Sequence, residues 1–117
     1  MIKNLPPQEI RLSPDKKSLR IIFTDRDFEI SAELLRVESP SAEVKGHGPE
    51  QKKIISGKKD VTITSLEAVG SYAIQITFSD GHRTGIYTFS YLRELGENQN
   101  QLWQDYLHNL ENKGLSR

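Results

Sequence analysis

The stretch VGSYAIQITFSDGHRTGIYTFSYLREL, residues 69–95, contains the clearest strand pattern, the sharpest turn and the start of a helix. Its residues Tyr72, Ile74, Ile76 and Phe78 alternate with smaller or polar residues. A period of two places the members of such a set on one face of a strand. We therefore expect a β-hairpin here, around which the rest of the fold is organised.

The turn of this hairpin is predicted at Asp80-Gly81, because both residue types tolerate the positive φ angles of a type I′ turn. A two-residue turn pairs Ile74 with Tyr87 on the returning strand. It also places His82 on the polar face of the hairpin. A glycine on the returning strand, at position 85, leaves room for a neighbouring segment.

Composition excludes several functional classes. The 117 residues include 16 basic and 16 acidic side chains and no cysteine. A net charge near zero gives no overall attraction to nucleic acid or to an anionic membrane. The lack of cysteine excludes disulfides, thiolate metal sites and a cysteine nucleophile. No apolar run approaches the roughly 20 residues of a membrane span, and the start of the chain has no apolar signal core. We expect a cytoplasmic protein with no membrane or nucleic-acid partner.

The remaining elements follow from local patterns. Alternation predicts strands near residues 8–12, 18–24, 28–30 and 61–66, with a further short strand at Ile54-Ile55. Ser31 can cap a short helix at 31–37. A second short helix is expected from Ser90 to Gly96, where glycine can end it.

The last predicted helix covers about residues 98–113. Asn98 followed by Gln101 fits a capping box, and Lys113 and Gly114 can close the helix. Its apolar residues fall at spacings of three and four and form one stripe. These residues are Leu102, Trp103, Tyr106, Leu107 and Leu110.

Together these patterns predict an α+β fold: a mainly antiparallel β-sheet with short helices and a C-terminal helix packed on the sheet. The length suits a single domain over residues 1–117, with a core at about 7–96 and the C-terminal helix at about 98–113. Residues 38–60 show no periodicity and contain several glycines, prolines and lysines, so we expect a long loop there.

Four segments carry a resemblance to a known family: LLR at 34–36, SPSAEV at 39–44, VGSYAIQITFSDGH at 69–82 and GIYTFSYLREL at 85–95. Over about residues 7–96 the chain resembles the γ-butyrobetaine hydroxylase-like N-terminal domain family. In eukaryotic hydroxylases this domain precedes an iron- and 2-oxoglutarate-dependent catalytic domain. It also occurs beside Mrp-type ATPases that carry iron–sulfur clusters, and bacteria have stand-alone copies.

The resemblance implies neither hydroxylase activity nor a zinc site for this chain. The sequence contains no counterpart of the oxygenase domain, so we expect no enzyme activity and no catalytic or cofactor-binding residues. In the hydroxylases, zinc is held by a Cys-x-Cys-x-x-Cys run and the histidine of Asp-Gly-His. The matching positions here are Ser39, Ser41, Val44 and His82. Zinc prefers thiolate and imidazole ligands, so one ligand of the four is retained and we expect no cofactor.

Two sets of candidate residues follow. If a divalent metal binds weakly through nitrogen and oxygen donors, the candidate ligands are His82, His47 and Glu43. The candidate functional surface comprises Asp80, Gly81, His82, Arg83 and His47. The alternative for His82 is a hydrogen-bonding strand residue, with Asp80 as its partner. For His47 the alternative is the tip of a loop.

Three functional classes fit these observations. The first is a non-catalytic interaction or accessory module with a protein partner, associated with iron–sulfur or other metalloenzyme proteins. The second is a small metal-binding protein that uses His82 with nearby histidine and carboxylate ligands. The third, a hydrolase, requires Asp80, His82 and a serine to converge.

Overall fold

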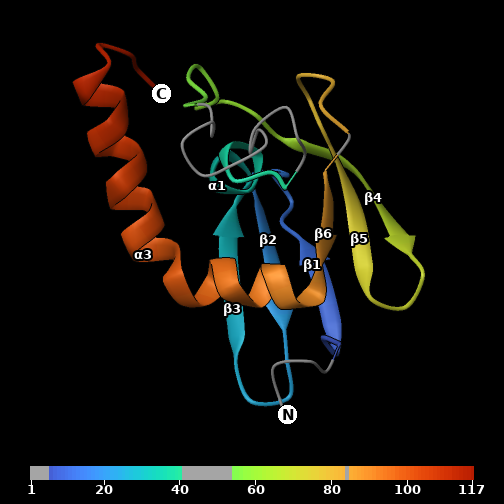
Figure 1. Cartoon of the computed structure of the whole chain (residues 1–117). Coiled ribbons are helices and arrows are strands. Elements are labelled where there is room, and N and C mark those ends of the chain that lie inside the picture. The colour runs from blue at the N-terminus through green and yellow to red at the C-terminus, as the bar shows by residue number, and fades with distance from the viewer. Residues whose placement is uncertain (1–5, 41–53, 84) are drawn as a thin grey trace.

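A computed structural model describes residues 6–40, 54–83 and 85–117 of the chain (Figure 1). Two antiparallel sheets of three strands each are found there, ordered β1-β2-β3 and β4-β5-β6, with one short and one long helix. The predicted α+β class is therefore confirmed. The elements are β1 (Glu9–Leu12), β2 (Ser18–Ile22), β3 (Asp27–Ser31), α1 (Ala32–Val37), β4 (Ile63–Val69), β5 (Ala73–Phe78), β6 (Ile86–Thr88) and α3 (Phe89–Asn112).

The first sheet follows the alternation in the sequence. In β2, Leu19 and Ile21 are fully buried, and their partners Ile30 and Phe28 in β3 are buried as well. Since paired residues of antiparallel strands share a face, these four side chains form the inner surface of the sheet. Charged residues occupy the other face, where Arg20 donates hydrogen bonds to two carboxylates of β3.

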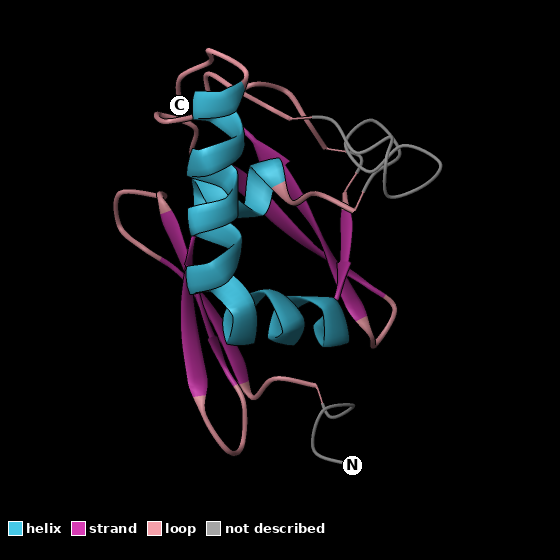
Figure 2. Ribbon diagram, turned by 60° about the vertical axis from the view of Figure 1, so that its left-hand side comes forward, coloured by secondary structure: helices cyan, strands magenta, loops and turns pink. Residues whose placement is uncertain are grey.

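The second sheet is the predicted hairpin with β4 added to one side. Ile76 and Phe78 of β5 are almost completely buried, and Ile74 pairs with Tyr87 of β6 as predicted. The two sheets and α3 enclose one core, in which α3 contacts both β3 and β6 (Figure 2). Ile54 and Ile55 form no strand; they are half-buried against this core instead.

Helix α1 confirms the predicted cap, since the Ser31 side chain accepts a hydrogen bond from the Leu34 N–H at 3.0 Å. The end of α3 is also as predicted. Lys113 is its C-cap and Gly114 follows in the left-handed conformation at φ 67°. The Leu115 N–H then bonds to the Leu110 carbonyl and the Gly114 N–H to the Glu111 carbonyl, which is the Schellman pattern.

The prediction of two separate helices in the C-terminal region was wrong. Helix α3 is continuous from Phe89 to Asn112, with Thr88 rather than Ser90 as its N-cap. It bends sharply, so its first half crosses the strands and its second half rises beside β3 (Figure 1). Asn98 lies inside the helix, where its side chain bonds to the Glu94 carbonyl.

Helix α3 makes a close contact with the first sheet at Gly96. A Cβ atom at this position would lie 2.4 Å from Cγ of Phe28 in β3, so only glycine lets the helix backbone approach the ring. Nearby, the guanidinium of Arg93 bonds to both oxygens of Asp25, at 2.7 and 2.5 Å. Hydrogen bonds from Arg93 outweigh burial and lower the pKa of Asp25 to about 2. These two contacts fix α3 against the first sheet.

The apolar stripe of α3 packs less completely than the spacing suggests. Tyr106 and Leu110 are buried in the core, whereas Leu102, Trp103 and Leu107 are half-buried at its margin. None of the helices in the described ranges is long and apolar enough to cross a bilayer.

We predict that Gly96→Ala destabilises the protein by about 1–3 kcal/mol, because the new methyl group overlaps the Phe28 ring in a packed core. Unfolding in urea, followed by circular dichroism, measures this loss. Asn100→Ala, at an exposed position of the same helix, is the matched control and should have little effect. Equal stability of Gly96→Ala and the wild type would show that the contact with Phe28 is loose.

Candidate functional site

The turn between β5 and β6 differs from the predicted two-residue turn. The Gly81 N–H bonds to the Phe78 carbonyl, and the Phe78 N–H bonds to the His82 carbonyl, both at 2.9 Å. Gly81 has φ 90°. This is a three-residue loop, a turn followed by a residue with positive φ, which is another common hairpin connection. Phe78, rather than Ser79, therefore lies opposite His82.

This one-residue difference moves His82 to the other face of the hairpin. It is 7% exposed, and its ring lies 6.2 Å from that of Phe78, centroid to centroid. The prediction that His82 emerges on the polar face was therefore wrong. The predicted Asp80 partnership is confirmed through the backbone, because the His82 N–H donates to Oδ1 of Asp80 at 3.1 Å.

The imidazole of His82 contacts the side chain of Ser39, a residue that follows α1. Nε2 of His82 and Oγ of Ser39 are 2.9 Å apart, and Ser39 is fully buried. Gly85 makes this possible, because a Cβ there would lie 2.5 Å from the Ser39 oxygen. The room predicted beside Gly85 is thus occupied by Ser39. A histidine, a serine and a glycine from two distant segments form one buried contact.

Two tyrosines hold the same segment. The hydroxyl of Tyr87 in β6 donates to the Leu35 carbonyl, and that of Tyr91 in α3 donates to the Glu38 carbonyl, each at 2.5 Å. Burial raises the pKa of both phenols well above the ordinary value of 10. The hydroxyls therefore stay protonated and keep donating to the end of α1 throughout the physiological range.

The carboxylate of Asp80 forms ion pairs with two basic side chains, next to His82. Its carboxylate accepts hydrogen bonds from Nε of Arg36 at 2.8 Å and Nζ of Lys58 at 2.6 Å. Burial alone would raise the pKa of Asp80. The bonds from Lys58, from the His82 backbone and from Arg36 outweigh burial and lower this pKa from 3.8 to about 2. Asp80 is therefore ionised at any physiological pH, and it ties the hairpin to α1 and to the segment before β4.

The predicted surface residues separate into two groups. Asp80, Gly81 and Arg83 are exposed at the turn, although the carboxylate of Asp80 is largely covered, while His82 is buried. His47 and Glu43 lie outside the described residues. We refer below to the buried contacts of Ser39 and His82 and the ion pairs of Asp80 as the latch, because they join the end of α1 to the β5–β6 hairpin.

The cations of the latch were not predicted. Nothing in the local pattern distinguishes Arg36 or Lys58 from an exposed basic residue. One feature of the sequence pointed to a contact between Ser39 and His82. Ser39 matches the first cysteine of the family's zinc-binding run, and His82 matches the histidine that binds the same zinc. A serine can keep that spatial relation to histidine by a hydrogen bond without any metal.

The latch does not form a nucleophilic centre. A serine and His82 do converge, as a hydrolase requires, but the serine oxygen is inaccessible because Ser39 is 0% exposed. The third member, Asp80, directs its carboxylate to Arg36, Lys58 and the His82 backbone N–H. A substrate carbonyl has no access to the serine, so the arrangement positions segments rather than performing acyl transfer.

The residues present also do not fit the family's zinc. Nε2 of His82 is already within hydrogen-bond distance of Oγ of Ser39, and a neutral serine hydroxyl is a poor zinc ligand. Within the described ranges, no group of three or more His, Cys, Asp or Glu side chains could hold a metal ion. The latch is therefore a hydrogen-bonded arrangement at the place where the hydroxylases have zinc ligands.

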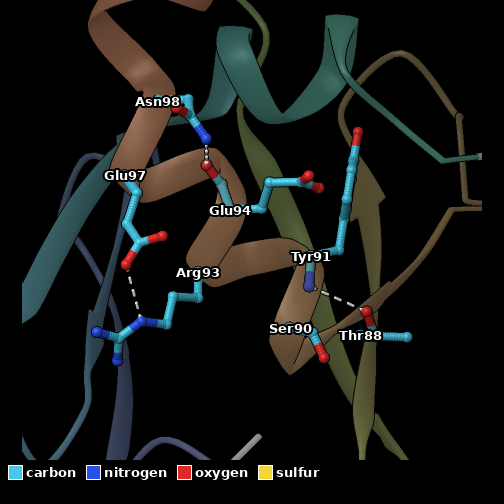
Figure 3. A pocket seen from close by; sticks show the side chains of 7 residues that line it. All are labelled: Thr88, Ser90, Tyr91, Arg93, Glu94, Glu97 and Asn98. Atoms are coloured by element: carbon cyan, nitrogen blue, oxygen red, sulfur yellow. Dashed lines mark hydrogen bonds and ion pairs between the residues drawn. The ribbon is translucent and has the colours of Figure 1, made fainter. Parts of the chain in front are cut away.

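A separate hollow of about 540 Å³ lies along the first half of α3 (Figure 3). Several of its polar groups bond to one another. Thr88 accepts from the Tyr91 N–H, Arg93 donates to Glu97, and Asn98 donates to the Glu94 carbonyl, as the dashed lines show. These bonds stabilise the helix, and the hollow has no nucleophile and base in contact.

The family model described as "Gamma-butyrobetaine hydroxylase-like, N-terminal" matches residues 10–93. This chain belongs to that family. No match was found among the curated proteins.

Solved structures with the same fold are similar in sequence as well. A protein solved by NMR in solution is 42% identical, with a TM-score of 0.83 over 96% of this chain and 89% of that one. A second NMR structure is 41% identical, with a TM-score of 0.82 over 96% of this chain and 84% of that one. A protein of unknown function in the DUF971 family from Acidithiobacillus ferrooxidans, solved by crystallography, is 35% identical. Its TM-score is 0.68, over 82% of this chain and 97% of that one.

The lowered pKa of Asp80 leads to a pH-dependent prediction. Because the folded-state pKa lies below the ordinary value, the ionised carboxylate stabilises the fold above pH ~4, and this stabilisation is lost as the pH falls towards ~2. Asp80→Asn should therefore be less stable than the wild type at neutral pH. The difference in unfolding free energy should shrink between pH ~4 and ~2.

Chemical unfolding at a series of pH values tests this prediction. Glu67→Gln removes one negative charge at an exposed position of β4 and serves as the control. A stability difference between Asp80→Asn and the wild type that is the same at low and neutral pH would contradict the proposed role of the carboxylate.

We also predict that the purified protein carries no stoichiometric zinc and that EDTA leaves its Tm unchanged. His82→Ala should then cost about 1–3 kcal/mol, as expected for the loss of a hydrogen bond that leaves its partner buried. Elemental analysis and thermal unfolding provide the two measurements. One zinc or iron per chain, removed by chelation with a loss of stability, would instead show that His82 is a metal ligand.

Proposed function

We propose that this protein is a non-catalytic interaction module that serves an accessory role for iron–sulfur or other metalloenzyme proteins. The observation that carries the proposal is the latch: its serine, histidine and aspartate are engaged in buried or ion-paired contacts with other parts of the same chain. These contacts hold a rigid hairpin turn rather than present a reactive group. The family's occurrence beside iron–sulfur ATPases and an iron-dependent oxygenase supports the type of partner.

The face that we assign to the partner is the outer side of the β5–β6 hairpin. Strand β6 lies at the edge of its sheet, and Ile86 on it is 44% exposed. Gln75 pairs with Ile86 and donates to the Arg83 carbonyl at 2.6 Å, which fixes the backbone between them. An exposed apolar residue near an exposed arginine, on a backbone held by hydrogen bonds, is a suitable anchor for a protein partner.

The metal-binding alternative has weaker support. It needs His82 to exchange Ser39 for a metal ion, and it depends on His47 and Glu43, which lie outside the described residues. A weakly bound divalent metal would in that case use nitrogen and oxygen donors. For the location, we propose the cytoplasm, which agrees with a sequence that has no cysteine.

Affinity capture from an extract of the source cells tests the proposed function. The wild-type protein should retain an iron–sulfur or metalloenzyme protein, and the double variant Arg83→Glu, Ile86→Asp should lose it. Lys17→Glu, Ala68→Asp is the matched control, because it makes the same kinds of change at two other exposed positions. Quantitative mass spectrometry compares the three captures. Identical sets of captured proteins for all three would refute the assigned face.

A further inference from the structure

A second site is built around the buried carboxylate of Glu33, which lies in the first turn of α1, whereas Arg36 of the latch lies in its last turn. The side chain of Glu33 is 6% exposed. It accepts two hydrogen bonds from the guanidinium of Arg117, from Nη2 at 2.7 Å and from Nε at 3.1 Å. The hydroxyl of Tyr106 in α3 donates to the same carboxylate at 3.2 Å. A two-point contact of this kind recognises the planar fork of a guanidinium.

The aromatic ring of Trp103 completes the recognition of the cation. The central carbon of the Arg117 guanidinium lies 5.0 Å from the centroid of this ring. Trp103 in turn packs beside Tyr106, with 5.3 Å between ring centroids. The guanidinium is therefore recognised in two ways at once, by hydrogen bonds to a carboxylate and by a cation–π contact with an indole.

The site opens into a hollow of about 490 Å³ between α3, α1 and the edge strand β3. Glu29 adds a second carboxylate to its wall, and that carboxylate is itself paired with Arg20. Asp60 lies near enough for its charge to raise the pKa of Arg117, after the larger effect of the Glu33 bonds. Lys59 borders a neighbouring hollow. The environment of the guanidinium is thus predominantly acidic.

The two halves of this contact are held very differently. Glu33, Trp103 and Tyr106 belong to helices, whereas Arg117 lies in the irregular segment after α3 and its side chain is 41% exposed. Removing the arginine leaves a buried carboxylate without a cation, which is costly. An acceptor on a helix and a partly exposed donor outside the regular elements make a site at which another guanidinium can compete with Arg117.

We propose that the Glu33–Trp103–Tyr106 site binds a guanidinium group, and that Arg117 occupies it as an internal competitor. The ligand is either a small guanidino compound or an arginine side chain of a partner protein, which share this chemistry. The inference is independent of the proposed hairpin interface. A tethered group competes at an effective concentration in the millimolar range, so the wild type should bind external guanidinium more weakly than a variant without Arg117.

The test uses Arg117→Ala and methylguanidinium chloride, titrated to about 50 mM to cover that range. Trp103 is the one tryptophan of the chain, so its fluorescence reports on the site. In the variant we expect a saturable change in fluorescence and a rise in Tm. The wild type should respond only at several-fold higher concentration. Methylammonium chloride at equal ionic strength is the ligand control, because a compact ammonium cannot make the two-point contact.

A second variant keeps the test decisive. Glu33→Gln in the Arg117→Ala background removes the acceptor charge with little change of shape, and it should abolish the response to methylguanidinium. A capped Ala-Ala-Arg-Ala-Ala peptide distinguishes the two ligand sources: tighter binding of the peptide favours a partner's arginine, and tighter binding of methylguanidinium favours a small compound. Equal effects of methylguanidinium and methylammonium, equal affinity of wild type and Arg117→Ala, or a response that survives Glu33→Gln would each overturn the proposal.

Discussion

The attachment of the α1 end to the β5–β6 hairpin is the constraint on which the rest of the structure depends. The Ser39–His82 bond, the Tyr87 hydroxyl and the Arg36–Asp80 ion pair all act on residues 35–39, which are the last turn of α1 and the residues directly after it. These contacts join the segment that leaves the first sheet to the second sheet. They are polar and buried or partly buried, and most of their donors and acceptors are paired with one another, which favours one arrangement. The exception among the described residues is Nη1 of Arg36, which is buried without a hydrogen-bond partner.

The fold was predictable from the sequence wherever one local pattern determined the outcome. The alternation in β2 and β5, the Ser31 cap and the Gly114 terminus depend on neighbours in the chain, and the structure confirms each of them. The glycine at position 96, inside α3, depends on a tertiary contact instead. Glycine there is required by the ring of Phe28 in a distant strand. A local rule could interpret this glycine only as a helix end.

The candidate site was predicted only in part for the same reason. The sequence identified Asp80, Gly81 and His82, since a turn is a local feature. The loop has three residues rather than two, and that single difference reverses the face on which His82 lies. Arg36 and Lys58 come from segments far from the turn, and no spacing rule connects them to it. Ser39 was traceable only by its resemblance to a family position.

The bend of α3 has a consequence for how the chain folds. Each sheet is assembled from strands that are adjacent in sequence, so most strand pairing can form early and locally. The helix contacts β6 with its beginning and β3 farther along, and it thereby spans both units. Its docking, with Gly96 packed on Phe28, therefore connects the two sheets a second time, in addition to the latch. We expect a loss of this docking to speed the exchange of amide hydrogens in both sheets together.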